Sequence, residues 1–228
     1  MSVNIDFVKK IIEEKIPGST VLIEDPKGDG YHLEAVVVSD SFKDVPEIVR
    51  HKMVYDSLEN MVGNEIHALS LKTLTNSEKD TNGKGTNLGN RVDSKDLSTD
   101  ILKKIHNIIQ KNDVVLFMKG TKNKPLCGFS KNVVDILSFM EVDFIDINVL
   151  TDNDINKKSE KEEHYLLDLK DVNSNDIRQG IKDYSNWPTI PQLYIKTEFI
   201  GGFDIVKDMF VSKNLHAFLK EKNIKFKE

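Results

Sequence analysis

The chain has 228 residues, of which 39% are hydrophobic and 30% are charged, and its formal net charge is −5. The composition is ordinary for a globular protein, and the length suits two modest domains better than one small one. No apolar run approaches the roughly 18 residues of a membrane-spanning helix, and the first residues carry neither a secretion signal nor a transit signal. We therefore expect a soluble protein of the cytoplasm or nucleus, with no membrane partner.

The first 75 residues predict a small domain with the element order α-β-β-α-β. Apolar residues recur at helical spacing from Val3 to Ile12, and Pro17-Gly18 ends that helix. β-branched residues on either side of a Pro/Gly-rich turn at 25–30 predict an antiparallel hairpin. The later elements follow as strands at 20–24 and 31–39, a helix at 45–61 and a strand at 65–74.

The charge is unevenly distributed along the chain. Residues 1–75 hold 8 Lys and Arg residues against 13 Asp and Glu, a net charge of −5, whereas the remainder holds 24 of each. An acidic domain is poorly suited to grip a phosphate backbone, so we do not expect nucleic acid as a partner.

Residues 76–97 are polar and rich in Gly and Asn, and they predict a flexible linker. A linker of this composition has a root-mean-square span of roughly 25 Å, which lets two domains meet without fixing their orientation.

Residues 98–228 predict a second domain with a β-loop-α-β unit, which requires a parallel strand pair. The apolar run 114–118 is typical of a strand buried on both faces, and a helix follows the turn that ends at Cys127. A charged stretch at about 153–175 is expected to be an inserted solvated loop. The remaining elements are a helix from residue 98, a strand at 142–147, a hairpin at 192–195 and 198–200, and a helical C-terminus.

Cys127 is the only cysteine of the chain, so neither an internal disulfide nor an all-cysteine metal site within one chain can form. The residue precedes a predicted helix, and the positive end of the helix dipole favours a thiolate there. Lys119 lies at the end of the preceding strand, where its ammonium group could approach the same thiolate or an anionic ligand. Ser130 stands where a C-x-x-C pair would have its second thiol. Any sulfur partner must come from outside the chain; the alternative is that Cys127 is a small buried apolar residue.

Five short blocks follow one another in this region: Met118-Lys119-Gly120-Thr121, Cys127-Gly128-Phe129-Ser130, Arg178-Gln179-Gly180, Trp187-Pro188-Thr189-Ile190-Pro191-Gln192 and Gly201-Gly202-Phe203-Asp204. In this order, over residues 98–222, they resemble the signatures of C-G-F-S monothiol glutaredoxins. This family has a thioredoxin-like fold.

The resemblance implies a glutathione site and a [2Fe–2S] cluster. Pro191 would be a cis-proline, and Thr189 and Ile190 would pair through their backbone with the glutathione cysteinyl group. Lys119, Arg178 and Lys182 would bind the glycine carboxylate. Phe129, Gly202, Phe203 and Asp204 would complete the site, with Asp204 meeting the γ-glutamyl ammonium group. The cluster would be held by Cys127 and a glutathione thiol, each supplied twice across a homodimer.

The N-terminal domain combines the α-β-β-α-β order with two specific blocks, Arg50-His51-Lys52-Met53-Val54-Tyr55 and the stretch from Glu65 to Leu74. Over residues 3–75 it resembles BolA proteins, which have a class II KH-like fold and are partners of monothiol glutaredoxins. The resemblance implies that His67 is a cluster ligand, with His32 as a further candidate; both could instead be structural. The other four histidines, His51, His106, His164 and His216, are taken as surface or helix residues.

We therefore expect a two-domain α/β and α+β protein that uses glutathione to bind or transfer a [2Fe–2S] cluster, or to sense iron. The alternatives are a glutathione-dependent thiol–disulfide oxidoreductase acting through Cys127 and a nucleic-acid-binding regulator. The sequence leaves open whether the protein is an enzyme. It also leaves open whether the BolA and glutaredoxin parts pair within one chain or between chains, and which iron–sulfur proteins receive the cluster.

Overall fold

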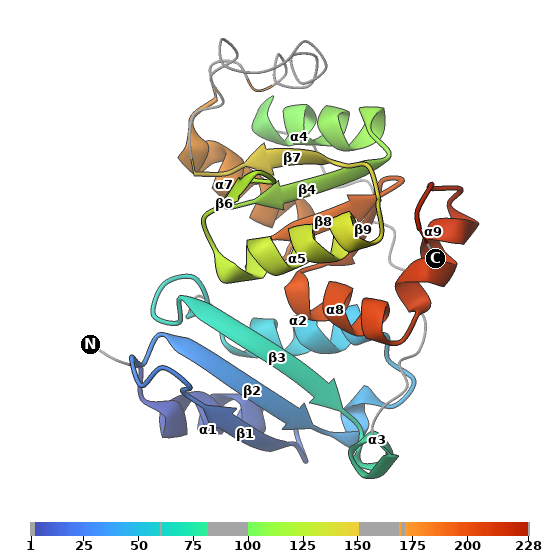
Figure 1. The fold of residues 1–228 in the computed structure, drawn as a ribbon. Coiled ribbons are helices and arrows are strands. Elements are labelled where there is room, and N and C mark those ends of the chain that lie inside the picture. Colours follow the sequence, from blue (N-terminus) through green and yellow to red (C-terminus); the bar gives the residue numbers. More distant parts are fainter. Residues whose placement is uncertain (1–2, 60, 82–99, 151–168, 170–171, 228) are drawn as a thin grey trace. The chain divides into compact units, whose positions relative to one another are not determined.

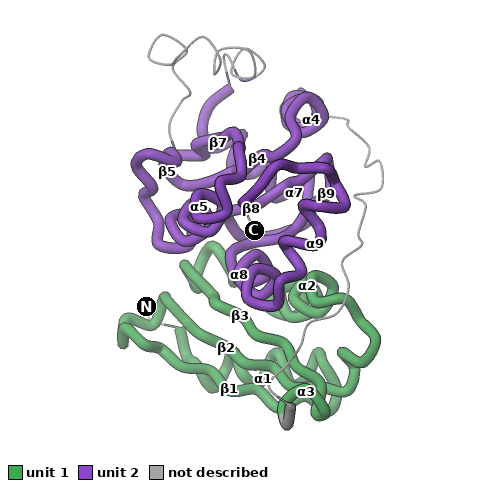
Figure 2. Tube along the Cα trace, turned by 45° about the vertical axis from the view of Figure 1, so that its right-hand side comes forward, with its two compact units in different colours: residues 1–89 green, residues 90–228 purple. Residues whose placement is uncertain are grey.

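The structure is a computed structural model that describes residues 3–59, 61–81, 100–150, 169 and 172–227. The chain divides into two compact units, residues 1–89 and 90–228 (Figure 2). Among the described residues, no helix combines the length and the apolar composition needed to cross a bilayer.

The first unit is a three-stranded sheet with two helices packed against it (Figure 1). The strand order is β1-β2-β3, with β1 antiparallel to β2 and β2 parallel to β3. Alternate strand residues and one face of each helix form the core, which includes Val8, Ile12, Val37, Val54 and Leu71. The elements are α1 (Ile5–Lys15), β1 (Thr20–Glu24), β2 (His32–Val38), the 3-10 turn η1 (Asp40–Phe42), α2 (Glu47–Ser57), β3 (Ala68–Leu74) and α3 (Asn76–Thr81).

Two element boundaries differ from those predicted. The second helix ends at Ser57 rather than near residue 61, because Leu58 caps it and Glu59 adopts a positive φ of 50°. The third strand starts at Ala68 rather than residue 65, because the N–H of Gly63 donates to the carbonyl of Ile66 and closes a turn before it.

The helix α3 lies inside the segment that we predicted to be linker. Thr75 and Glu78 form a capping box: Thr75 Oγ1 accepts from the Glu78 N–H at 3.1 Å, and Glu78 Oε2 accepts from the Thr75 N–H at 2.8 Å. The expectation of flexibility from residue 76 was therefore wrong for residues 76–81. The rest of the predicted linker, 82–97, lies outside the described residues.

The second unit is a four-stranded mixed sheet between two pairs of helices (Figure 1). The strand order is β7-β4-β8-β9, and the predicted parallel pair of β4 with β7 and hairpin of β8 with β9 are both present. The helices α4 and α7 pack together on one face, and α5 and α8 on the other. All five residues of β4 are buried.

The elements of this unit are α4 (Asp100–Lys111), β4 (Val114–Met118), β5 (Gly120–Thr121), β6 (Lys124–Pro125), α5 (Gly128–Phe139), β7 (Ile145–Asn148), α7 (Ser174–Ser185), β8 (Gln192–Ile195), β9 (Glu198–Gly201), α8 (Phe203–Val211) and α9 (Asn214–Glu221). Most of the predicted insert, residues 153–168 and 170–171, lies outside the described residues. Its predicted end was wrong, because Ser174 and Asn175 already belong to α7, which is capped by the Asp176 N–H donating to Asn173 Oδ1 at 3.0 Å.

Candidate functional site

Cys127 is the N-cap residue of α5, as predicted, and its side chain is partly exposed. Its backbone is extended, with φ −146° and ψ 139°, and its carbonyl accepts the first helical hydrogen bond from the Lys131 N–H at 2.9 Å. The side chain itself makes no capping bond to the helix. The sulfur atom is thus placed at the end of the helix that favours negative charge.

A short hairpin, β5 with β6, leads from the end of β4 to Cys127. It requires glycine at position 120, where φ is +89° and a Cβ atom would lie 2.4 Å from the carbonyl oxygen of Lys124. The Leu126 N–H donates to the Lys119 carbonyl at 2.9 Å, and the Lys119 N–H donates to Ser130 Oγ at 3.1 Å. Ser130, which stands where a second thiol would be, is fully buried and joins α5 to the end of β4.

The loop before β8 forms a second wall of the site. The Ile190–Pro191 peptide bond is cis, as predicted. Trp187 Nε1 donates to Thr189 Oγ1 at 2.8 Å, and the Gln192 amide donates to the Thr189 carbonyl at 3.1 Å. The backbone of Ile190 has no hydrogen-bond partner in the part of the chain that the structure describes, so it can pair with an added peptide.

The start of α8 closes the site. Gly202 is its N-cap residue, and a Cβ atom there would lie 3.4 Å from the carbonyl oxygen of Pro191. The Phe203 ring stacks on that of Phe129, in the first turn of α5, with centroids 5.6 Å apart. Asp204 follows in the first turn of α8. The structure therefore brings together the Cys127 helix, the cis-proline loop and the α8 N-terminus.

Three predicted cations also gather near this site. Burial lowers the pKa of Lys182, and the positive charges of Arg178 and then Lys119 lower it further. These two cations are therefore within electrostatic reach of Lys182, although Lys119 belongs to the end of β4 and the other two to α7. Arg178 donates from Nη2 to Asn175 Oδ1 at 2.7 Å. An anion bound here would relieve the repulsion among the three cations.

A second candidate site lies in the first unit, where His67 and His32 come together. His32 begins β2 and pairs with Ala68, the first residue of β3, so His67, which immediately precedes β3, is its diagonal neighbour. The two imidazole rings are edge to face with centroids 6.4 Å apart, and the exposed His67 ring stacks on Tyr31 at 4.7 Å. His32 Nδ1 lies 2.7 Å from Asp29 Oδ2. The N–H of Tyr31 lowers the pKa of Asp29 below its ordinary value, and His32 contributes to the same shift.

The residues present fit an iron–sulfur cluster only in combination with outside ligands. No group of three or more His, Cys, Asp or Glu side chains among the described residues could hold a metal ion. Thiolate and imidazole are nevertheless the ligands that [2Fe–2S] clusters take, and four are needed. Two imidazoles on one tetrahedral metal have centroids roughly 5 Å apart, so the His32 and His67 rings, at 6.4 Å, would have to approach by about 1 Å.

Comparisons with known proteins assign each unit separately. A family model described as BolA-like protein matches residues 16–78, and one described as Glutaredoxin matches residues 114–165 and 161–200. The chain is 45% identical over 120 residues to the probable monothiol glutaredoxin 2 of Rickettsia typhi, which covers 53% of this chain and 88% of that protein.

A further relative and a solved structure come from two other organisms. The mitochondrial monothiol glutaredoxin-5 of Schizosaccharomyces pombe is 39% identical over 127 residues, covering 56% of this chain and 74% of that protein. The solved structure of a bolA protein homologue from Coxiella burnetii is 39% identical, covers 34% of this chain and 97% of that chain, and superposes with a TM-score of 0.31.

Proposed function

Since this chain belongs to the monothiol glutaredoxins and carries a BolA-like domain ahead of its thioredoxin-fold glutaredoxin domain, we propose that it binds a [2Fe–2S] cluster with glutathione, for transfer or for iron sensing. The observation that carries the proposal is the position of Cys127. It is the chain's only thiol, and it lies partly exposed at the N-terminus of α5, whose first turn packs through Phe129 against Phe203 at the start of α8.

Glutathione has two negative ends, an ammonium group and a peptide backbone, and the site offers a partner for each. The cations Lys119, Arg178 and Lys182 suit the glycine carboxylate, and the guanidinium group of Arg178 can bind it in a bidentate manner. The Ile190 backbone suits the cysteinyl amide, as in strand addition. The N–H groups at the start of α8 suit the γ-glutamyl carboxylate, and Asp204 suits its ammonium group.

The cluster takes four ligands, and the chain can complete that number in two ways. In a homodimer, Cys127 and glutathione each contribute two thiolates. In a mixed site, within one chain or between chains, Cys127 and glutathione hold one iron while His67, with His32, holds the other. When bound, the cluster supplies exchangeable iron and sulfide for recipient iron–sulfur proteins. The chain's own part is to present the Cys127 sulfur at the N-terminus of α5 and to keep glutathione beside it.

Substitution of His67 tests the mixed site. In the full chain, reconstituted anaerobically with glutathione, His67→Ala should change the visible absorption and circular dichroism of the cluster, because replacement of an imidazole alters the electronic environment of one iron. The matched control is His164→Ala, which removes an imidazole from the predicted insert and should leave the spectrum unchanged. Identical spectra for wild type and His67→Ala would reject His67 as a ligand.

A second candidate function is the reduction of glutathionylated proteins, favoured by the partial exposure of Cys127. The Cys127 thiolate would attack the glutathione sulfur of a protein–glutathione disulfide and release the protein thiol. A free glutathione thiolate would then attack the Cys127–glutathione disulfide, regenerating Cys127 and forming oxidised glutathione. Ser130 does not prevent this route, because external glutathione replaces the missing second thiol. Turnover of a glutathionylated substrate separates the two functions, since a carrier alone would show almost none.

A further inference from the structure

The loop between β1 and β2 is held by two aspartates that bind its backbone. Asp25 Oδ2 accepts from the Gly30 N–H at 2.7 Å. Asp29 Oδ1 accepts from two successive N–H groups, those of Tyr31 at 2.8 Å and His32 at 3.0 Å. The Asp29 carboxylate is therefore fixed in place by the chain itself, independently of any contact that it makes with the His32 ring.

The second oxygen of Asp29 determines which nitrogen of His32 carries the proton. Oδ2 lies 2.7 Å from Nδ1 of the imidazole. An ionised carboxylate can only accept hydrogen bonds, so a neutral His32 must carry its proton on Nδ1. The lone pair is then on Nε2, at the opposite side of the ring, where a metal ion can bind. Metal-binding histidines in proteins regularly donate their other N–H to a carboxylate or carbonyl in this way.

The neighbouring residues place His67 beside this oriented ring. The Tyr31 carbonyl accepts from the N–H groups of His67 at 2.9 Å and Ala68 at 3.1 Å, which fixes the start of β3 next to His32. The His32 ring is at 90° to the His67 ring, and the His67 side chain is exposed. The backbone partners of Asp29 and His67 are thus adjacent residues of one short segment, Tyr31 and His32.

We propose that Asp29 is a positioning residue, which fixes His32 as the Nδ1–H tautomer and so makes Nε2 the second imidazole ligand of the iron bound by His67. This inference rests on the proposed function, because it assigns a role within the mixed cluster site. It goes beyond that function in adding a carboxylate that does not touch the metal but determines whether His32 can bind it.

Asp29→Asn is the variant that separates a positioning role from a structural one. The amide oxygen can still accept from the N–H groups of Tyr31 and His32, so the turn is kept. The amide nitrogen can only donate, and facing Nδ1 it would favour the Nε2–H tautomer, which cannot bind iron through Nε2. Glu34→Gln is the matched control, because it removes one carboxylate charge from an exposed position of the same strand, β2.

The first readout needs no cluster. In the cluster-free full chain labelled with ¹⁵N, His32 should show a protonated Nδ1 and an unprotonated Nε2 in the wild type and in Glu34→Gln. The assignment should be reversed in Asp29→Asn, while the amide resonances of Tyr31 and His32 confirm that the turn is intact. A wild-type Nε2–H tautomer, or an unchanged tautomer in Asp29→Asn, would overturn the proposal.

The second readout uses the reconstituted chain. Asp29→Asn should change the visible spectrum in the same direction as His32→Ala, and its cluster should be lost to a chelator roughly 10–100-fold more readily than that of Glu34→Gln. A spectrum and a chelator sensitivity equal to wild type would overturn the proposal. A wild-type chain that binds no cluster would contradict the proposed function as well, whereas failure of the tautomer reversal alone contradicts only the role of Asp29.

Discussion

The His51 side chain, on α2, is fully buried in the first unit. Burial, with a smaller contribution from the positive charge of Arg50, lowers its pKa from 6.5 to about 3. In the folded protein His51 is therefore neutral throughout the physiological range, whereas in the unfolded chain it takes up a proton below about pH 6.5.

This difference predicts that the first unit loses stability in mild acid. Between pH 6.5 and about 3 the unfolded state binds more protons than the folded state, so His51 should lower the free energy of unfolding by up to about 1.4 kcal/mol per pH unit. His51→Leu should flatten this dependence. The measurement is urea unfolding of the full chain, followed through NMR signals of residues 1–75, at neutral pH and at about pH 5. The exposed His67, changed to Ala, is the control; parallel pH profiles for wild type and His51→Leu would contradict the assignment.

At the residue scale, two backbone features of the candidate site were predicted from the sequence, but its internal contacts were not. The helix-capping position of Cys127 and the cis geometry of Pro191 were predicted and are present. The bond from the Lys119 N–H to Ser130 Oγ was not, because it joins residues that only the packed fold brings together. The contact of Asp29 with His32 could have been found from sequence, since an aspartate often bonds the backbone two or three residues on.

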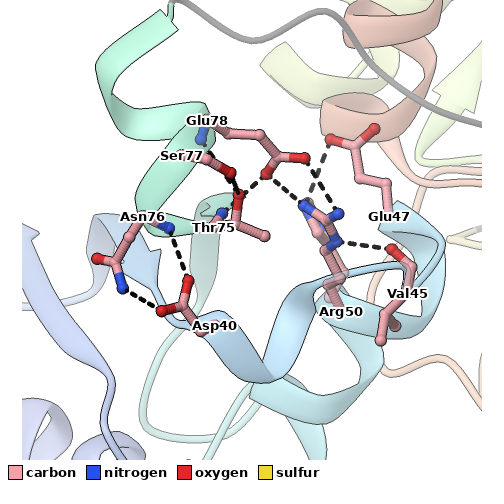
Figure 3. A network of polar contacts seen from close by, with 9 residues as sticks. Asp40, Val45, Glu47, Arg50, Thr75, Asn76, Ser77 and Glu78 are labelled. Carbon is pink, nitrogen blue, oxygen red and sulfur yellow. Dashed lines mark hydrogen bonds and ion pairs between the residues drawn. The ribbon is translucent and has the colours of Figure 1, made fainter.

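At the scale of single elements, α3 is attached to the rest of the first unit by a network of polar contacts (Figure 3). Arg50 donates from Nη1 and Nη2 to the two carboxylate oxygens of Glu78, at 2.6 and 3.1 Å, and from Nε to the Val45 carbonyl at 2.7 Å. Asn76 donates from Nδ2 to Asp40 at 2.8 Å. Partial burial raises the pKa of Glu78, but the Arg50 guanidinium outweighs it and holds that pKa below its ordinary value.

Glu78→Ala should therefore destabilise the first unit by about 2–3 kcal/mol, because it leaves the buried Arg50 guanidinium without its carboxylate. The wild-type contribution is present above the unfolded pKa of Glu78 and is lost as the pH falls through its lower folded value. Urea unfolding at neutral pH measures the effect. Lys79→Ala, on the exposed side of the same helix, is the control, and equal losses for the two variants would show that the ion pair adds nothing.

The sheets were easier to predict from sequence than this helix. The run Val114–Met118 indicated a buried strand, and the unit that follows it required the parallel pair seen between β4 and β7. The signal for α3 was also in the sequence, as the T-x-x-E capping box from Thr75 to Glu78. We predicted a linker instead, because the residues that follow are polar and rich in Gly, and one capping motif at the start of a short helix is weaker evidence than that composition.

At the scale of the whole molecule, the two-domain organisation and both family resemblances were predicted from sequence and are confirmed by the family matches. The presence of both domains in one chain bears on the proposed mixed site. Covalent linkage of two binding modules by a short flexible segment gives an effective concentration of roughly millimolar, so the proposed mixed site would be favoured over pairing between dilute partners. Sequence patterns report local structure and could not determine which pairing forms.

The most direct test of the account is anaerobic reconstitution of the full chain with iron, sulfide and glutathione, followed by visible absorption and circular dichroism beside Cys127→Ser. Because Cys127 is the only protein thiolate available to the cluster, the wild type should give a glutathione-dependent [2Fe–2S] spectrum that is absent from the variant. A folded wild-type chain that remains colourless, or a Cys127→Ser chain that loads equally well, would contradict the central claim.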